Sequence, residues 1–168
     1  MKTCNAILTT FCFLLAACGQ MNAEPEPATS TNARSDQLIG VASVIDGDTI
    51  EIHGKRIRLS GFDAPERGKR CGDTNVYQKA ALYLSDQIGT KTVTCITTGE
   101  DRYDRAIATC SVNGTDLGDI MVGAGWARDW PKYSLGQYKG EEASARSAQR
   151  GVWALTCPDD LWGNRDYQ

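Results

Sequence analysis

The sequence predicts an α+β fold in which five strands surround a small barrel core and three helices pack against it. Two observations support this prediction: short β-rich runs separated by turn residues come first, and segments with helical spacing follow. The chain of 168 residues suits one modest domain, because a domain typically takes roughly 100 to 200 residues. We therefore expect a single hydrophobic core.

The first three strands are expected at residues 38–45, 49–53 and 56–60, which are rich in β-branched and aliphatic side chains. Glycine-centred turns at residues 46–48 and 53–55 separate these runs. Turns of this kind join neighbouring antiparallel strands. The three runs therefore predict a meander.

A helix is expected at residues 75–88, because Ala80, Ala81, Leu84 and Ile88 recur at three-to-four spacing and would share one face. This face is apolar and predicts packing against the barrel. The rest of the segment is mostly polar, as expected for a helix with one exposed side.

The second half of the chain predicts a β-hairpin followed by two helices. Residues 91–97 and 105–113 are β-branched runs on either side of a charged connection. Asp116 is expected to cap a short helix at 117–124. Residues 140–149 begin with acids and precede an arginine, which is the charge order that the helix dipole favours.

The N-terminal residues predict an export signal. Lys2 precedes an apolar run at residues 6–17, which is shorter than the roughly 20 residues that a membrane-spanning helix needs. Residues 1–17 are therefore interpreted as a signal peptide. Two alanines precede Cys18, which resembles the lipobox of bacterial lipoproteins and implies lipidation of Cys18. An ordinary signal peptide with an incidental cysteine is the alternative.

The chain after the signal divides into three parts. Residues 18–38 contain few apolar side chains and predict a flexible, lipid-anchored tether. Residues 39–155 are expected to form the folded domain, and residues 156–168 a C-terminal tail. We expect an exported bacterial protein that is lipid-anchored to the cell membrane or the outer membrane, or secreted.

Four cysteines remain beyond residue 18, and an oxidising compartment favours disulfides between them. Four cysteines allow three pairings. The predicted hairpin brings Cys95 near Cys110, which leaves Cys71 for Cys157. Free buried thiols are the alternative, and a zinc site is disfavoured because no pair has CxxC spacing.

Charged side chains gather at strand ends in a pattern that suits phosphodiester cleavage. Asp48 and Asp63 lie in two acidic loops and, with a backbone carbonyl, would suit a calcium ion. Arg58 lies five residues before Asp63, and a dense charged cluster occupies residues 101–105. A metal ion and guanidinium groups neutralise phosphate oxygens, while a carboxylate orients or deprotonates water. Taken alone, each acidic turn has a simpler interpretation as a hairpin or loop signal.

The single histidine, His53, excludes metal or nucleophile schemes that need two imidazoles. The chemistry must therefore use carboxylates, arginines or cysteines.

These motifs resemble the staphylococcal nuclease family. The resemblance covers about residues 39–154 and rests on VIDGDTI at 44–50, RLSGFDAPE at 58–66, DRYDR at 101–105 and GVW at 151–153. It implies a five-stranded OB-fold β-barrel with three helices. It also implies a Ca²⁺-dependent endonuclease that cleaves DNA and RNA without sequence specificity and leaves 3′-phosphates.

The resemblance implies a metal site and a base. Asp48 and Asp63 match the calcium carboxylates, and Ala64 matches the residue that offers its backbone carbonyl, although threonine is commoner there. Glu66 matches the glutamate that removes a proton from the attacking water or positions that water.

The resemblance further implies residues that contact the nucleic acid. Arg58 and Arg105 match the two arginines that stabilise the transition state. Tyr103 matches a tyrosine that lines the nucleotide pocket, and Tyr133 is a weaker match for a base-stacking tyrosine. Asp104 stands where glycine is frequent and is expected to alter the orientation of Arg105 or the affinity for an anionic substrate.

The net charge of -3 needs explanation in a protein with a nucleic-acid partner. Residues 39–155 carry 15 basic and 15 acidic side chains, and residues 55–70 carry six basic against two acidic. The excess acid therefore lies mostly outside the domain, which favours transient capture over tight sequence-specific binding. We also expect a monomer.

A noncatalytic OB-fold nucleic-acid-binding lipoprotein is the alternative function. Replacement of Glu66, Arg58 or Arg105 would mark such a protein. All three residues are present.

Overall fold

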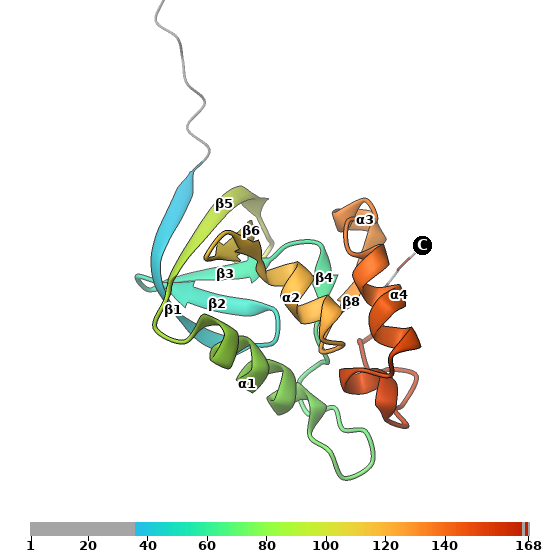
Figure 1. Ribbon diagram of the computed structural model, residues 1–168. Helices are drawn as coiled ribbons and strands as arrows, with labels where there is room; N and C mark the ends of the chain where they lie inside the picture. Colours follow the sequence, from blue (N-terminus) through green and yellow to red (C-terminus); the bar gives the residue numbers. More distant parts are fainter. Residues whose placement is uncertain (1–35, 166, 168) are drawn as a thin grey trace, which may run out of the picture. The chain divides into compact units, whose positions relative to one another are not determined.

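The computed structural model describes residues 36–165 and residue 167. Five strands form the barrel (Figure 1), and these are β1 (Gln37–Asp46), β2 (Thr49–Ile52), β3 (Lys55–Leu59), β5 (Thr92–Glu100) and β6 (Ala106–Val112). Their order is β3-β2-β1-β5-β6, and parallel pairing of β3 with β6 closes the barrel. The predicted α+β fold with a five-stranded OB-fold barrel is confirmed.

Three two-residue strands accompany the barrel. β7 (Thr115–Asp116) pairs with β6, whereas β4 (Phe62–Asp63) and β8 (Arg128–Asp129) form a separate two-stranded sheet. The β4–β8 register places Asp63 opposite Arg128. This small sheet therefore fixes the backbone of one predicted calcium ligand.

The three predicted helices are present. α1 (Val76–Ile88) buries one residue on almost every turn, and the Asn75 side chain caps it by accepting from the Gln78 backbone N–H at 3.1 Å. α2 (Leu117–Gly123) is capped by Asp116, as predicted. α4 (Lys139–Ser147) carries acids in its first turn and Arg146 in its last.

Two shorter helical segments were not expected from the sequence. α3 (Pro131–Ser134) follows β8, and the 3-10 helix η1 (Gly151–Ala154) follows α4. Both have four residues, which is too short to show a helical period. No helix within the described part of the chain is long and apolar enough to span a bilayer.

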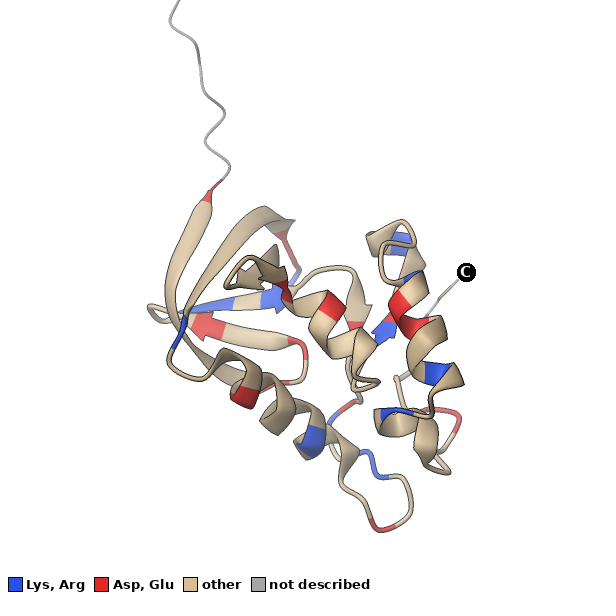
Figure 2. Cartoon of the chain, viewed as in Figure 1, with Lys and Arg blue, Asp and Glu red and all other residues tan. Residues whose placement is uncertain are grey.

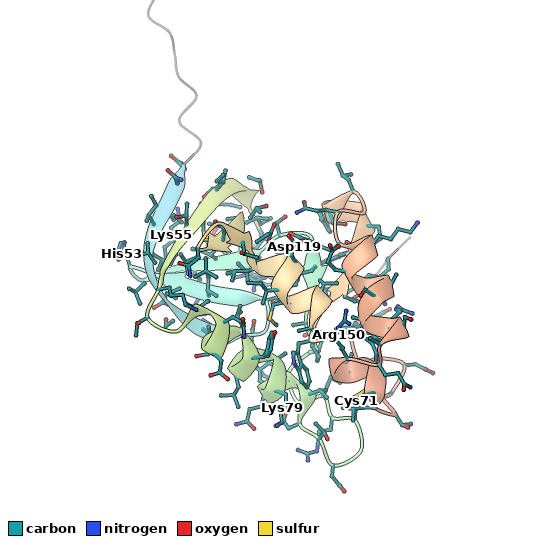
Figure 3. The ribbon with its side chains drawn as sticks, viewed as in Figure 1. His53, Lys55, Cys71, Lys79, Asp119 and Arg150 are labelled. Atoms are coloured by element: carbon teal, nitrogen blue, oxygen red, sulfur yellow. A yellow bond between two sulfur atoms is a disulfide. The ribbon has the colours of Figure 1, made fainter. Side chains whose placement is uncertain are left out.

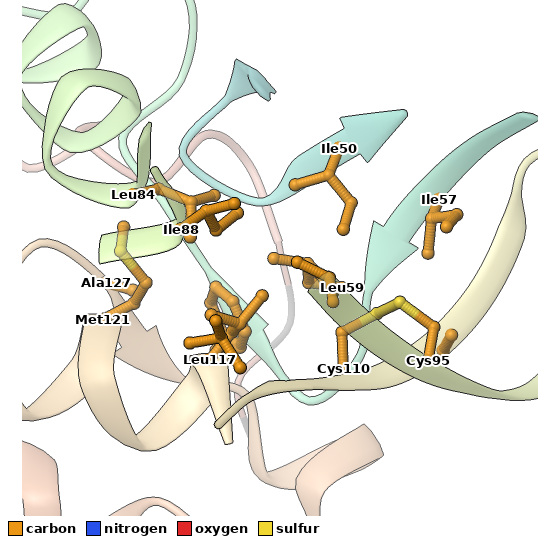
Figure 4. Packing of buried hydrophobic residues seen from close by; sticks show 14 of the residues in the cluster. Ile50, Ile57, Leu59, Leu84, Ile88, Cys95, Cys110, Leu117, Met121 and Ala127 are labelled. Carbon is orange, nitrogen blue, oxygen red and sulfur yellow. A yellow bond between two sulfur atoms is a disulfide. The ribbon is translucent and has the colours of Figure 1, made fainter. Parts of the chain in front are cut away.

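The barrel core contains alternate residues of β2 and β3 together with one face of α1 (Figure 4). Ile50, Ile52 and Ile57 have no exposed surface, and neither has Leu84 of α1. Strand alternation and helical spacing direct these side chains to the same interior, as the sequence pattern predicted.

Both expected disulfides are present. Cys95 and Cys110 face each other in the β5–β6 register and are bonded inside the core (Figure 4). Cys71 is bonded to Cys157, 86 residues away. This second bond joins the loop before α1 to the segment that the sequence suggested as a tail.

The residues after 155 pack against the domain. Leu161 and Trp162 are 3% and 7% exposed and belong to a second hydrophobic cluster with Cys71, Val76 and Val152. The predicted signal peptide, Cys18 and nearly all of the predicted tether lie outside the described residues.

Candidate active site

Arg58 lies between the two aspartates predicted as calcium ligands. It comes from β3, is 9% exposed and forms an ion pair with Asp48 Oδ2 at 3.1 Å through Nη1. Its Nη2 donates to Asp63 Oδ1. The Arg58 Nη1 also donates to the Leu59 carbonyl at 2.9 Å. One buried guanidinium therefore draws both carboxylates together.

Asp48 lies in the turn between β1 and β2 and contacts the loop that follows β4. Its Oδ2 accepts from the Ala64 backbone N–H at 3.1 Å. Gly47 makes this approach possible, because a Cβ there would lie 2.5 Å from the Ala64 Cβ and 2.9 Å from the Ala80 Cβ. The structure thus brings Asp48, Asp63 and Ala64 together, as the sequence predicted.

The electrostatics of these carboxylates are unusual. Burial raises the pKa of Asp63 to about 6, although Arg58, Arg165 and the Tyr167 hydroxyl act in the opposite direction. Burial, followed by the charge of Asp48, raises the pKa of Asp46. Burial is the largest cause of both shifts, so these carboxylates lie in a poorly hydrated part of the site.

Arg105 reaches the same region from the start of β6. Its Nε donates to Asp101 Oδ2 at 2.7 Å, and its Nη1 donates to Thr49 Oγ1 at 3.4 Å. Asp104 has φ +59°, a conformation that glycine adopts readily. The Asp101 side chain, through its bonds with the guanidinium, holds Arg105 in place.

The predicted aromatic residues line a neighbouring pocket of about 480 Å³. Tyr103 is 63% exposed and Tyr133 is 55% exposed, and Arg58 and Arg105 also border this pocket. Trp130 lines it as well and packs edge to face against Tyr133, with ring centroids 4.6 Å apart. The sequence interpretation missed Trp130, although an aromatic residue three positions before Tyr133 was a usable signal.

Two further residues of the site come from the segment that was interpreted as a tail. Arg165 Nε lies 3.2 Å from Asp63 Oδ2, and its Nη2 donates to Glu66 Oε1. The Tyr167 hydroxyl donates to Asp63 Oδ2 at 2.7 Å. An arginine and a tyrosine after the last cysteine were the only sequence signals of these contacts.

A small cavity of about 140 Å³ joins the acidic and basic groups. Its lining includes Asp46, Asp48, Glu66, Arg58, Arg105 and Arg165. Figure 2 shows the basic colour of β3 beside acidic residues at both ends of β2. Carboxylates, guanidinium groups and a general-base candidate therefore meet in one place.

The donor set fits a calcium ion that keeps part of its water. Oxygen ligands are those that calcium prefers, and Asp48, Asp63 and the Ala64 carbonyl would supply them. Among residues 36–165 and 167, no three His, Cys, Asp or Glu side chains are grouped closely enough to hold a metal ion by themselves.

His53 takes no part in this site. It lies with Lys55 around the β2–β3 turn (Figure 3), at the other end of β2 from Asp48. The predicted strand at residues 49–53 ends one residue earlier, at Ile52, and His53 lies in the turn with φ +52°.

Comparisons with known proteins agree with this geometry. A family model described as "Staphylococcal nuclease homologue" matches residues 56–155, a range that includes Arg58, Asp63, Glu66 and Arg105. The succinoglycan biosynthesis protein ExoI of Rhizobium meliloti is 35% identical over 126 residues, which are 71% of this chain and 66% of that protein, just under two thirds of its length.

Two other relatives are named as nucleases. An uncharacterized endonuclease of Haemophilus influenzae is 30% identical over 77% of this chain and 73% of its own length. An uncharacterized endonuclease of Escherichia coli O157:H7 is 31% identical over 73% of this chain and 80% of its own length. With the barrel, the site and these matches in agreement, the chain belongs to the staphylococcal nuclease family.

Proposed function

We propose that this protein is a Ca²⁺-dependent endonuclease that hydrolyses phosphodiester bonds in DNA and RNA and leaves 3′-phosphates. The observation that carries the proposal is the meeting of Asp48, Glu66, Arg58 and Arg105 around one cavity, with Asp63 bonded to Arg58. The relatives named as endonucleases support hydrolysis of nucleic acid.

Asp48, Asp63 and the Ala64 carbonyl would hold the calcium ion. When bound, the ion supplies positive charge that stabilises the negative charge developing on the phosphate. The chain contributes a preformed pair of carboxylates, because Arg58 and the Ala64 N–H already fix Asp48.

Glu66 is the group that would handle the proton of the attacking water. Its side chain is 37% exposed and borders the cavity, so water can reach it. Glu66 would accept a proton from that water or hold the water in line with the phosphorus atom.

Arg58 and Arg105 would donate to phosphate oxygens as charge builds in the transition state. Guanidinium groups suit this role because their planar donors match two oxygens at once. Arg105 is partly exposed and borders both the cavity and the aromatic pocket, so it can contact a phosphate next to a bound nucleotide.

The aromatic pocket would take bases by stacking. Tyr103 and Tyr133 expose more than half of their surface, and Trp130 supports Tyr133. Stacking accepts every base, which agrees with cleavage that is not sequence-specific.

Export, lipidation of Cys18 and membrane anchoring are part of the same proposal. They rest on the sequence of residues 1–38, nearly all of which lie outside the described part. Mass analysis of the mature N-terminus tests them, because an unmodified cysteine or cleavage elsewhere would exclude lipidation. The monomeric state also stays a prediction, which light scattering would check.

The nuclease proposal is tested with the full chain, single-stranded DNA or RNA, and calcium or a chelator. We expect calcium-dependent cleavage that falls by about 10² to 10⁴ in Glu66→Gln and by about 10² to 10³ in Arg58→Ala. Matched controls are Glu51→Gln and Arg56→Ala, whose side chains form an outer pair on β2 and β3 and should leave the rate unchanged. Binding without cleavage would instead support the noncatalytic module.

A further inference from the structure

The carboxylate of Glu66 has an unusual setting, because it lies on a loop yet is held by residues almost 100 positions later in the chain. The Glu66 backbone N–H donates to the Leu161 carbonyl at 3.1 Å. A Cβ on Gly163 would lie 3.1 Å from Glu66 Cγ and 3.2 Å from Oε1. Arg165 Nη2 donates to Glu66 Oε1. Three positions, each two residues apart, therefore contact Glu66.

The segment that makes these contacts, residues 157–165 with Tyr167, is itself firmly attached. The Cys71–Cys157 disulfide holds its start, and Lys69 forms an ion pair with Asp160 at 2.5 Å. Leu161 and Trp162 are buried in the second hydrophobic cluster. We name residues 157–165 and Tyr167 the C-terminal strap.

The far end of the strap is fixed by Tyr167. The Arg128 guanidinium lies over the Tyr167 ring, 3.7 Å from its centroid. The Tyr167 hydroxyl donates to Asp63 Oδ2 at 2.7 Å. The strap is thus attached on both sides of Arg165.

Arg165 is the only side chain within the described residues that bonds the Glu66 carboxylate. The same guanidinium reaches Asp63 Oδ2 through Nε at 3.2 Å. An arginine side chain is always cationic in proteins, so the contact is charged on both sides. One planar group therefore connects the proposed base with a proposed metal ligand.

A partly exposed glutamate on a loop samples several rotamers, whereas a base must be held to within about 0.5 Å of its productive position. A displacement of about 1 Å can lower the rate about 100-fold. A guanidinium that also contacts Asp63 restricts the Glu66 side chain in a way that the loop alone does not.

We propose that the C-terminal strap is part of the catalytic site and that Arg165 is a positioning residue for Glu66. The inference rests on the proposed nuclease function and deepens it. Arg165 holds the Glu66 carboxylate beside the cavity, while Arg58 and Arg105 remain the groups that contact phosphate. Loss of Arg165 should therefore impair turnover more than substrate binding.

The test compares Arg165→Ala and Arg165→Lys with wild type in the full chain. We expect Arg165→Ala to lower kcat between about 10- and 100-fold with little change in KM. Arg165→Lys should recover only part of the rate, because an ammonium lacks the planar fork that spans two carboxylates. Arg56→Ala is the matched control, since it removes an exposed arginine that pairs with a carboxylate outside the site.

A second readout does not depend on cleavage. Calcium alone is titrated into each variant by calorimetry, and Arg165→Ala should bind it as tightly as wild type or up to about fivefold more tightly, because a cation that contacts Asp63 is gone. A purely structural role would lower kcat, calcium affinity and Tm together and would overturn the proposal.

Two other results separate this inference from the function on which it rests. Higher activity in Arg165→Ala would show that the strap inhibits the site, and an unchanged kcat would show that Arg165 does not position Glu66. Either result refutes the inference while an active wild type supports the nuclease. An inactive wild type would refute the proposed function and this inference with it.

Discussion

Replacement of Gly47 by alanine tests whether the turn between Asp46 and Asp48 sets the size of the calcium site. Gly47 packs where the β1–β2 turn meets both the loop after β4 and helix α1. The added Cβ would lie 2.5 Å from the Ala64 Cβ and 2.9 Å from the Ala80 Cβ. Both neighbours are methyl groups attached directly to backbone, so neither can rotate away.

The size of the effect follows from these distances. Carbon atoms normally approach to about 3.5 to 4.0 Å, so the turn and the loop must separate by about 1 Å. Overpacking of this kind typically costs about 1 to 3 kcal/mol, and the lower backbone entropy of the unfolded variant offsets about 0.4 to 1 kcal/mol. We expect a net loss of about 1 to 2 kcal/mol in the free energy of unfolding.

The same displacement moves Ala64 away from Asp48, so calcium affinity should fall about tenfold or more. Urea unfolding measures the stability, and calcium titration measures the affinity. Gly99→Ala is the control, because nothing lies within 4 Å of a Cβ there. The Gly47→Ala/Ala64→Gly double variant should recover part of both losses. Wild-type stability and calcium affinity in Gly47→Ala would refute this account of the turn.

Three further predictions concern stability and substrate binding. The Cys71→Ser/Cys157→Ser double variant should lose about 4 to 5 kcal/mol of its free energy of unfolding, because the disulfide closes a loop of 86 residues. A wild-type free energy of unfolding, measured in urea, would contradict this. Leu84→Ala should lower the free energy of unfolding by about 2 to 5 kcal/mol and lower Tm, because it leaves a cavity in the core. Leu82→Ala, at a 53% exposed position of the same helix, should change Tm little. In steady-state cleavage assays, Tyr133→Ala should raise KM several-fold and leave kcat nearly unchanged, because stacking on an aromatic ring contributes about 1 to 3 kcal/mol per base. A lower kcat with an unchanged KM would exclude a binding role for Tyr133.

Much of the fold was predictable because its signals are local. The β-branched and aliphatic runs of β2 and β3 and the three-to-four spacing in α1 are each visible in neighbouring residues, and the structure confirms these elements. The Cys95–Cys110 bond followed from the hairpin register, in which the two residues are directly opposite.

The proposed catalytic residues could be identified from the sequence because they lie in short motifs at or near strand ends. Asp48 ends a turn, Arg58 lies in β3, Asp63 ends β4, and Glu66 follows in the loop after it. The barrel then brings these motifs together, and this step requires only that β2, β3 and β6 are neighbours.

The missed residues depend on contacts that no local pattern encodes. Arg165 meets Glu66 across 99 positions and Tyr167 meets Asp63 across 104. Trp130 lies between a two-residue strand and a four-residue helix, where no period can form. The Cys71–Cys157 disulfide and the buried Leu161 and Trp162 help to hold this segment on the domain, and their partners are distant in the sequence.

The central claim is that calcium and Glu66 act together to cleave a phosphodiester bond. The most direct measurement is single-turnover cleavage of 5′-labelled single-stranded DNA, with calcium or with chelator, by wild type, Glu66→Gln and the control Glu51→Gln. The account predicts products with 3′-phosphates from wild type and from Glu51→Gln with calcium, and a rate at least about 100-fold lower from Glu66→Gln. Cleavage that persists in chelator, or a wild-type rate from Glu66→Gln, would contradict it.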